Sequence, residues 1–285
     1  MLVAGNNSGR TDLRGRLPEL QHWEYSPEGQ VINRSLIAGI YPQGLAYDGN
    51  GHLFVANYDT GSVSEYTTSG QVVRANVVTG LNGPMGIALD GAGFLYVVTG
   101  GYYGPGTVGK YTTSGAPVNA SLISGLNWPV SVAVDEAGHL FVADYDYGVV
   151  KEYTTAGAVV NPALVSGLNL PTGLALDGNG HLFVSCVGSG VIGEYSTSGE
   201  PVNPMFLSGL NDPKWVACDG NGHLFVSMPA VYSVAEYTTS GELVNPALIT
   251  GVGAQALVVV PEPLQAIQIL LAGIIVAAKL RHRNR

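Results

Sequence analysis

Short apolar runs separated by Gly-containing turns fill most of this chain, and their order repeats. In the copy from Leu170 to Asn211, the turn residues Asp177 to Gly180 and Ser198-Gly199 lie between the runs. No helical periodicity interrupts them, and runs of this length with such turns are typical of β-strands. Each copy therefore predicts four short strands, here at Thr172 to Leu176, His181 to Cys186, Val191 to Ser196 and Val202 to Leu207.

The repeat extends along almost the whole chain. The Asp that ends each first strand recurs at spacings of 42, 45, 42 and 42 residues, at positions Asp48, Asp90, Asp135, Asp177 and Asp219. Complete copies begin at Tyr41, Gly83, Trp128, Leu170 and Asp212. A unit of about 40 residues with four strands has the length of one blade of a β-propeller.

Partial copies at the two ends of the chain complement each other. Met1 to Gly9 resembles a second strand, Trp23 to Ile40 resembles a third and a fourth strand, and Ala254 to Val259 has the character of a first strand. Arg10 to Leu20 is an insertion between them. We therefore expect an all-β fold over residues 1–259. The expected fold is a six-bladed β-propeller of four-stranded blades, closed by pairing of Gln255 to Val259 with the N-terminal strands.

Composition agrees with a single folded propeller. The 285 residues include 40 Gly, and only 12% are charged, which suits tight turns between short strands and argues against disorder. The formal net charge of −9 argues against nucleic acid as a partner, because binding to phosphates requires a basic surface.

The chain changes character at Val260-Pro261-Glu262-Pro263. Leu264 to Ala278 has no charged residue, and the basic stretch Lys279 to Arg285 follows it directly. Because all cations of this tail follow the apolar run, the positive-inside tendency places the basic end in the cytoplasm and the propeller outside. We expect residues 260–285 to form a separate tail with a short transmembrane helix over Ile267 to Ala278. A buried or amphipathic helix is the alternative, because a full span needs about 20 residues.

The order of these parts resembles the PEP-CTERM sorting signal of exported bacterial proteins. The matching residues are Val260, Pro261, Glu262 and Pro263, and the basic positions Arg281, Arg283 and Arg285. The resemblance implies transient membrane anchoring and an exosortase-type processing enzyme, which removes the tail and delivers the protein to the cell surface or the medium. Members of that family also carry an N-terminal secretion signal. Met1 to Leu20 has no such pattern, so we expect that the chain as given lacks its true start.

The propeller repeat itself resembles NHL-repeat and related six-bladed propellers. The resemblance is carried by the pattern G-L-x-x-P-x-G-I/L-A-L-D-G-x-G-x-L-F-V at Gly80 to Val97 and Gly167 to Val184. It covers nearly all of Met1 to Val259. Propellers include binding modules, scaffolds and enzymes, so function has to be argued from a site.

Most residues capable of chemistry recur at fixed places in the repeat, which indicates structural roles. We expect the turn Asp to accept backbone N–H groups, the following His to pack or hydrogen-bond at the turn, and a third-strand Tyr to pack between sheets. The His and Tyr positions are His52, His139, His181 and His223, and Tyr66, Tyr111, Tyr153, Tyr195 and Tyr237. Cys186 and Cys218 are predicted toward opposite ends of their sheets, so we expect buried thiols without a disulfide.

The segments that differ between copies follow the second strands and join one copy to the next. Alternate connections of such a sheet emerge on one face, so these segments are predicted to form a rim around the channel. Their Tyr, Trp and Asp side chains suit stacking on sugar rings and hydrogen bonding to hydroxyls, or contact with a protein. The candidate residues are Asn57, Tyr58, Asp59, Tyr102, Tyr103, Trp128, Asp144, Tyr145, Asp146, Tyr147, Lys214 and Trp215.

Two functions remain open. The first is a non-catalytic, exported or cell-surface binding or scaffold propeller without a cofactor, whose partner is an extracellular polysaccharide or an envelope protein. The alternative is a metal-dependent enzyme similar to gluconolactonase-like or streptogramin lyase-like propellers, with Ca²⁺ or another divalent cation in the channel. Such a site needs non-repeated Glu, Asn, Asp or His on the axis, and Asn57 and Asp144 are the nearest candidates.

Overall fold

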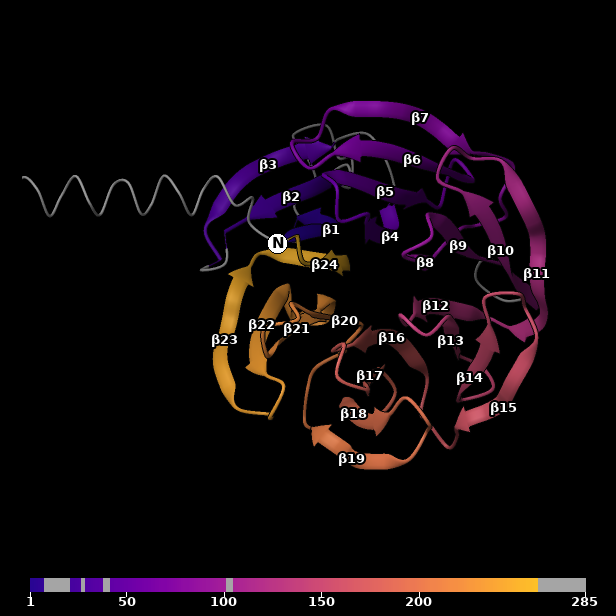
Figure 1. The fold of residues 1–285 in the computed structure, drawn as a ribbon. Helices are drawn as coiled ribbons and strands as arrows, with labels where there is room; N and C mark the ends of the chain where they lie inside the picture. Colours follow the sequence, from indigo (N-terminus) through magenta and orange to yellow (C-terminus); the bar gives the residue numbers. More distant parts are fainter. Residues whose placement is uncertain (8–20, 27–28, 38–41, 101–104, 261–285) are drawn as a thin grey trace, which may run out of the picture.

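The computed structural model describes residues 1–7, 21–26, 29–37, 42–100 and 105–260. Its strands form six four-stranded sheets that stand like blades around a central axis (Figure 1). Neighbouring strands within each sheet are antiparallel. The protein is therefore an all-β propeller.

Five of the sheets are each built from one continuous stretch of chain, in the order innermost to outermost strand. The first two consist of β4 (Pro42–Tyr47), β5 (His52–Asn57), β6 (Ser62–Thr67) and β7 (Val72–Val78), and of β8 (Ile87–Leu89), β9 (Phe94–Thr99), β10 (Pro105–Thr112) and β11 (Pro117–Asn127). The next consists of β12 (Pro129–Val134), β13 (His139–Asp144), β14 (Val149–Thr154) and β15 (Val159–Val165). The last two consist of β16 (Pro171–Leu176), β17 (His181–Cys186), β18 (Val191–Ser196) and β19 (Pro201–Leu207), and of β20 (Trp215–Cys218), β21 (His223–Met228), β22 (Ser233–Thr238) and β23 (Leu243–Thr250).

The sixth sheet is assembled from both ends of the chain. Its order is β24 (Val252–Val258), β1 (Leu2–Asn7), β2 (Gln21–Tyr25) and β3 (Val31–Ile37). Leu2 lies opposite Val258, and Val3 lies opposite Leu257. This is the pairing expected from the complementary partial repeats. The predicted insertion, Arg10 to Leu20, lies outside the described residues.

The six innermost strands form a closed ring. In Figure 1 these strands surround the axis, and each contacts the next in the order β24, β4, β8, β12, β16 and β20, with β20 adjoining β24 again. Each inner strand remains the edge of its own sheet, but closure leaves this edge short and protected around the axis. We call these six strands, with the residues that directly precede them, the inner ring.

Each second strand is buried on both faces, which explains its continuous apolar sequence. In β5, Leu53 and Val55 pack into a cluster with Leu2 and Ala256 of the preceding sheet. Phe54 packs into a different cluster with Leu95 of the following sheet. Because successive side chains of a strand point to opposite faces, one strand joins two neighbours. Loss of a ring such as that of Phe54 is expected to cost about 3–5 kcal/mol.

The sheets approach each other closely near the axis. The Gly86 amide donates to the carbonyl oxygen of Val130 in the next sheet at 3.0 Å. A Cβ atom added at Gly86 would lie 2.7 Å from both the Cα of Ser131 and the carbonyl oxygen of Val130. Any side chain at this position would therefore push two sheets apart, which explains a glycine directly before the first strand β8.

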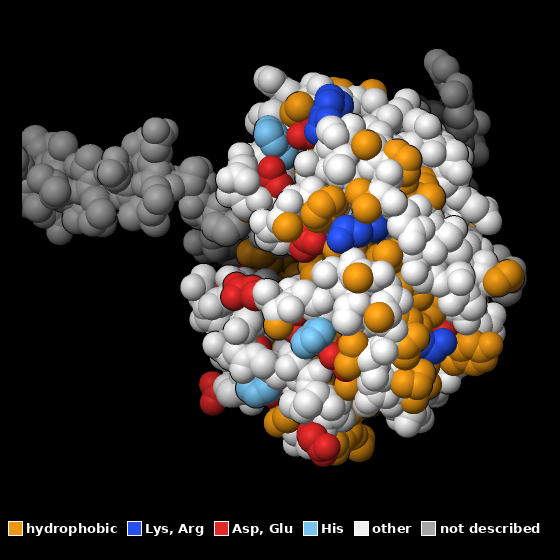
Figure 2. Space-filling view, turned by 45° about the vertical axis from the view of Figure 1, so that its right-hand side comes forward, with side chains coloured by type: hydrophobic (Ala, Val, Ile, Leu, Met, Phe, Trp, Pro, Cys, Tyr) orange, Lys and Arg blue, Asp and Glu red, His pale blue; other side chains and the backbone are white. Residues whose placement is uncertain are grey.

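The side wall of the propeller exposes isolated apolar groups. Figure 2 shows them in separate patches among polar atoms. The described residues of this kind lie mainly on the outermost strands: Val72, Val73, Val118, Val159, Val160, Val202, Met205, Leu243 and Val244. Pro162, Pro204 and Pro246 occur in the same strands, β15, β19 and β23, where proline limits pairing with another edge.

Helical structure is slight in the described part of the chain. It comprises a single 3₁₀ turn, η1 (Pro229–Val231), between β21 and β22. The predicted tail helix over Ile267 to Ala278 falls on residues 261–285, outside the described residues. No helix among the residues that are described is long and apolar enough to cross a membrane.

Candidate binding rim

The two faces of the ring differ in construction. Each first strand runs from one face of the ring to the other. The strand β16, for example, starts next to Leu170 on one face and ends at the turn Asp177 to Gly180 on the opposite face. We call the face with these turns the turn face, and the opposite face the rim.

On the turn face, the repeated Asp and His hold the hairpin together. One carboxylate oxygen of Asp177 accepts from the amides of Asn179 at 2.7 Å and His181 at 3.1 Å. Its other oxygen lies 3.0 Å from Nδ1 of His181. These hydrogen bonds lower the pKa of the Asp177 carboxyl, although burial acts in the opposite direction. The predicted structural roles of the turn Asp and His are confirmed.

The same hydrogen bonds recur in other sheets, with a Glu from the third strand added. Nδ1 of His52 lies 3.2 Å from Asp48 and 3.4 Å from Glu65. Nδ1 of His223 lies 2.9 Å from Asp219. No group of three or more His, Cys, Asp or Glu side chains among the described residues is arranged to hold a metal ion.

The sheet β8–β11 replaces this arrangement with different chemistry. Phe94 stands at the His position, and Lys110 stands at the Glu position of the third strand. The Lys110 ammonium lies 4.2 Å from the ring centre of Phe94 and donates to the carbonyl oxygen of Thr155 at 3.1 Å. The Tyr96 hydroxyl donates to Asp90 at 2.9 Å, and burial together with this bond raises the pKa of Tyr96. A cation–π contact thus takes the place of a His–carboxylate contact.

On the rim, the loops after second strands bond to the segments that join the sheets. The Tyr145 amide donates to the carbonyl oxygen of Trp128 at 3.2 Å. The Val187 amide donates in the same way to Leu170, also at 3.2 Å. The two kinds of variable segment therefore lie on one face, as the repeat predicts.

Aromatic side chains gather at one side of the rim. The rings of Trp128 and Tyr145 have centroids 4.4 Å apart and are tilted by 47°. Trp128 has a φ of 57°, a left-handed conformation that is uncommon for a bulky residue and turns the chain between β11 and β12. Tyr147 is 58% exposed, and the Lys151 ammonium lies 4.6 Å from its ring centre. We call these three rings, with Lys151, the aromatic rim site. Tyr147 is its exposed ring, whereas Trp128 and Tyr145 are half-buried and pack against the apolar cluster of the inner ring.

Asp144 serves the rim as a buried ion-pair partner. Its carboxylate is fully buried and accepts from the Lys151 ammonium at 2.7 Å and from the Asn127 amide at 3.1 Å. Burial raises the pKa of Asp144, while Lys151 and the Asn127 amide act in the opposite direction. The carboxylate therefore fixes Lys151 beneath Tyr147. Asn57, at the equivalent strand end, donates to the Ser64 hydroxyl at 3.3 Å.

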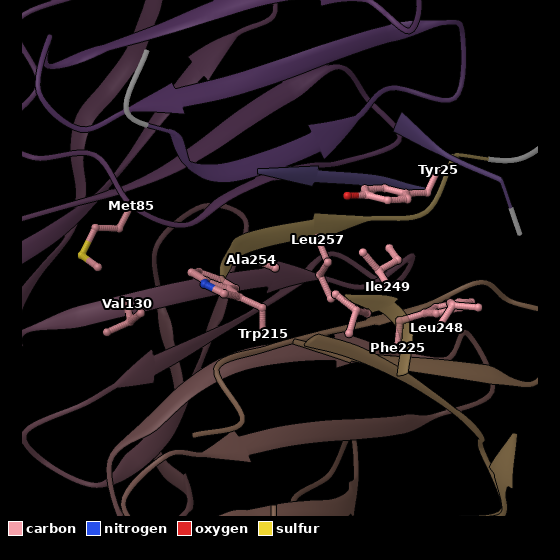
Figure 3. Close-up of a cluster of buried hydrophobic side chains, with 10 residues drawn as sticks. Tyr25, Met85, Val130, Trp215, Phe225, Leu248, Ile249, Ala254 and Leu257 are labelled. Atoms are coloured by element: carbon pink, nitrogen blue, oxygen red, sulfur yellow. The ribbon is translucent and has the colours of Figure 1, made fainter. Parts of the chain in front are cut away.

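The inner ring is closed at its rim end largely by apolar side chains. The residue five positions before the one that follows each first strand differs from sheet to sheet: Gln43, Met85, Val130, Thr172, Lys214 and Ala254. Met85, Val130 and Ala254 belong with Trp215 to one buried cluster. In Figure 3 the Trp215 indole points toward Met85 and Val130, which lie on the other side of the inner ring.

Lys214 is the cation of the inner ring. Its ammonium donates to the side-chain oxygen of Gln255 at 2.6 Å. Burial lowers the pKa of Lys214, and nearby Asp212 acts in the opposite direction.

The predicted site residues thus separate into three groups. Tyr58, Trp128, Tyr145 and Lys214 are half-buried, and Asp59, Asp146 and Tyr147 are exposed. Asn57, Asp144 and Trp215 are buried, so their side chains support the surface from within. Tyr102 and Tyr103, and all sorting-signal residues except Val260, lie outside the described residues. The prediction missed Gln43, Met85 and Val130, although their position differs in every copy and that variation was available as a signal.

Clefts described by the structure lie between neighbouring sheets. One of about 590 Å³ is lined by Cys186, Tyr195 and Met205 along the side of the sheet β16–β19. Another of about 710 Å³ lies on the turn face, where Asp48, Arg74 and Asp90 line it. Arg74 bonds to Glu65 and to the carbonyl oxygen of Thr113, which ties the sheet β4–β7 to the next one.

The two cysteines form no disulfide, as predicted; Cys186 is buried, whereas Cys218 is only half-buried. Cys186 ends β17 on the rim and Cys218 ends β20 toward the turn face, so the thiols lie toward opposite faces. Burial raises the pKa of Cys186 to about 11 and that of Cys218 to about 12. Both side chains act as small apolar groups.

Comparisons with known proteins show a likeness in fold and no match in sequence. No protein-family model and no curated protein matches the chain. A solved nidogen/laminin complex contains a chain with a TM-score of 0.70 and 16% identity, covering 86% of this chain and 91% of that one. A gluconolactonase from Xanthomonas campestris has a TM-score of 0.63 and 17% identity, covering 88% and 89%. A putative gluconolactonase has a TM-score of 0.63 and 19% identity, covering 77% and 82%. These likenesses show a shared β-propeller fold.

Proposed function

We propose that this protein is a non-catalytic binding or scaffold propeller that recognises its partner through the aromatic rim site. The observation that carries the proposal is the grouping of Trp128, Tyr145 and Tyr147 on one side of the rim, with Lys151 held beneath Tyr147. Aromatic rings at a protein surface bind sugar rings or protein side chains, and they act there as contact groups rather than as general acids or bases.

The inner ring supports a binding role over a catalytic one. Met85, Val130 and Trp215 pack together where a substrate would enter, and Lys214 stands where a divalent cation would need carboxylates. Asp144, the carboxylate expected nearest the channel, is already paired with Lys151. The residues described therefore fit a divalent cation poorly.

We propose an exported protein that is processed by an exosortase-type enzyme, with an extracellular polysaccharide or an envelope protein as its partner. The PEP-CTERM resemblance of Val260 to Arg285 supports this proposal. Val259 lines the cleft on the turn face, so the described part of the chain ends near that face. A membrane anchor in the tail would then hold the turn face toward the bilayer and direct the aromatic rim site away from it.

A second candidate is a metal-dependent lactonase-like or lyase-like enzyme. The fold likeness to two gluconolactonase structures favours it. It requires turnover that depends on a divalent cation and on a non-repeated carboxylate, for which Asp144 is the candidate.

One experiment separates the two functions. The purified chain is assayed for binding to a panel of glycans and envelope proteins, and for lactone hydrolysis with and without Ca²⁺. Our proposal predicts binding without turnover. Ca²⁺-dependent hydrolysis that is lost in Asp144→Asn, a variant that keeps the side-chain shape, would contradict the binding function and support the enzyme.

A further inference from the structure

Lys214 differs from the other cations of the described chain. It has no carboxylate within ion-pair distance and no aromatic ring beneath its ammonium, whereas the other cations with described side chains have such partners: Arg74 with Glu65, Lys151 with Asp144, and Lys110 with Phe94 and Tyr96. Its acceptor is the neutral amide oxygen of Gln255. Asp212 lies nearby but beyond ion-pair distance, so the half-buried ammonium has lost hydration without a carboxylate in direct contact, which is costly.

Two further polar side chains in the inner ring are buried without a partner among the described residues. Gln43 is 0% exposed, and neither its amide nitrogen nor its amide oxygen is hydrogen-bonded. Trp215 is 7% exposed, and its indole Nε1 has no acceptor. Buried polar groups are nearly always hydrogen-bonded, so the two N–H donors, the Gln43 amide nitrogen and the Trp215 indole, indicate that another molecule accepts from them.

The three side chains belong to the same end of the inner ring. Gln43 and Lys214 occupy equivalent positions, five residues before Asp48 and Asp219, at the rim end of their first strands. Strands β4 and β20 both adjoin β24, whose Gln255 holds the Lys214 ammonium. Figure 3 shows the Trp215 ring extending into the space between the first strands, with its nitrogen on the side of Met85 and Val130.

We propose that the rim end of the inner ring binds a small anion. The anion accepts hydrogen bonds from the Lys214 ammonium, the Trp215 indole N–H and the Gln43 amide, and it supplies a negative charge in direct contact with Lys214. Chloride and a single carboxylate such as formate both have this chemistry, because each accepts from several donors within a small volume. Met85 and Val130 lie in the same buried cluster as Trp215. The proposal stands independently of what the aromatic rim site binds.

Thermal unfolding of the full chain tests this proposal. The melting temperature is measured at constant ionic strength in about 100 mM sodium chloride, sodium formate or the sodium salt of a bulky sulfonate. We expect chloride or formate to raise the melting temperature by about 2 °C or more over the sulfonate, because a ligand that binds only the folded state stabilises it. The chloride and formate arms distinguish a halide from a carboxylate.

Three variants locate the effect. Lys214→Met should lose the response and, in the sulfonate, should melt no lower than the wild type, because it removes a half-buried charge that has no carboxylate in direct contact. Gln43→Met should reduce the response, while Lys110→Met, on the turn face, should leave it unchanged. An equal response in Lys214→Met, or no difference between the three salts in the wild type, would overturn the proposal and leave water as the acceptor.

Discussion

The turn face and the rim are built from the same strands, yet they differ in how far their residues repeat. On the turn face, Asp and His recur and bond to each other, as Asp177 and His181 do. On the rim, the equivalent strand ends carry Asn57, Asp144 or Cys186, each with different contacts. The comparison teaches that repeated polar residues hold the hairpins of this fold, whereas unrepeated ones create a surface particular to one side of the ring.

The largest expected contrast is between two tyrosines near the ends of one strand. Tyr153 is 6% exposed and packs with Val98 and Leu140, whereas Tyr147 is 58% exposed on the rim. Tyr153→Ala should lower the free energy of unfolding by about 3 kcal/mol, because it leaves a cavity. Tyr147→Ala should change it by about 0.5 kcal/mol or less. Urea unfolding measures both, and similar losses would remove the distinction between the two faces.

Asp177→Ala tests the hydrogen bonds of the turn face. Loss of its three hydrogen bonds should lower the free energy of unfolding by about 1–3 kcal/mol at neutral pH. The exposed Asp146 on the rim supplies the control, since Asp146→Ala should cost about 0.5 kcal/mol or less.

The same carboxyl predicts a dependence on pH. Hydrogen bonding holds the pKa of Asp177 below its unfolded value, so its stabilisation is present above about pH 3.9 and is lost as the pH falls through the lower folded value. Denaturant titrations across this acid range should show a smaller loss of stability in Asp177→Ala than in the wild type. Equal slopes would show that this carboxyl does not contribute.

Replacing the Lys110–Phe94 contact of the sheet β8–β11 with the His–Glu arrangement of the other sheets should have an intermediate effect. Lys110→Glu alone removes the contact with Phe94 and the hydrogen bond to Thr155, and it brings a carboxylate toward Asp90, so we expect a loss of about 1–2 kcal/mol. Adding Phe94→His recreates the arrangement of the other sheets. A double-mutant cycle should then give a favourable coupling of about 1 kcal/mol. Strict additivity would show that the two positions are independent.

The smallest expected difference between the two faces concerns the thiols, one of which lies toward each face. Burial raises the pKa of Cys186 to about 11 and that of Cys218 to about 12, so the thiolate is scarce at neutral pH on both faces. Labelling of the folded protein with an alkylating reagent should be on the order of 100-fold slower than that of a free thiol. Labelling at the free-thiol rate, while the protein remains folded, would contradict the burial of these residues.

The strands and the ring closure could be predicted from the sequence because both depend on local periodicity. Thr172 to Leu176 was predicted as a first strand, and β16 spans Pro171–Leu176. The turn chemistry of Asp177 was predictable for the same reason, since donor and acceptor lie within four residues.

The inner ring required the three-dimensional arrangement. Lys214 and Gln255 are 41 residues apart, and only ring closure brings them within 2.6 Å. Trp215 was predicted as a contact residue of the rim, yet its side chain is buried because it belongs to a first strand and extends toward Met85 and Val130. The pairing of Asp144 with Lys151 across the hairpin of β13 and β14 was also missed. A periodic pattern shows which positions vary but not which varying positions meet.

The most direct test of our account is the affinity of Trp128→Ala for whatever ligand the binding panel identifies. Trp128 contacts Tyr145 in the aromatic rim site, whereas Met205 is 66% exposed on the side wall. Calorimetric titration should show affinity at least about tenfold weaker for Trp128→Ala, a loss of about 1.4 kcal/mol, and unchanged affinity for Met205→Ala. Wild-type affinity in a folded Trp128→Ala variant would contradict a binding function located at this site.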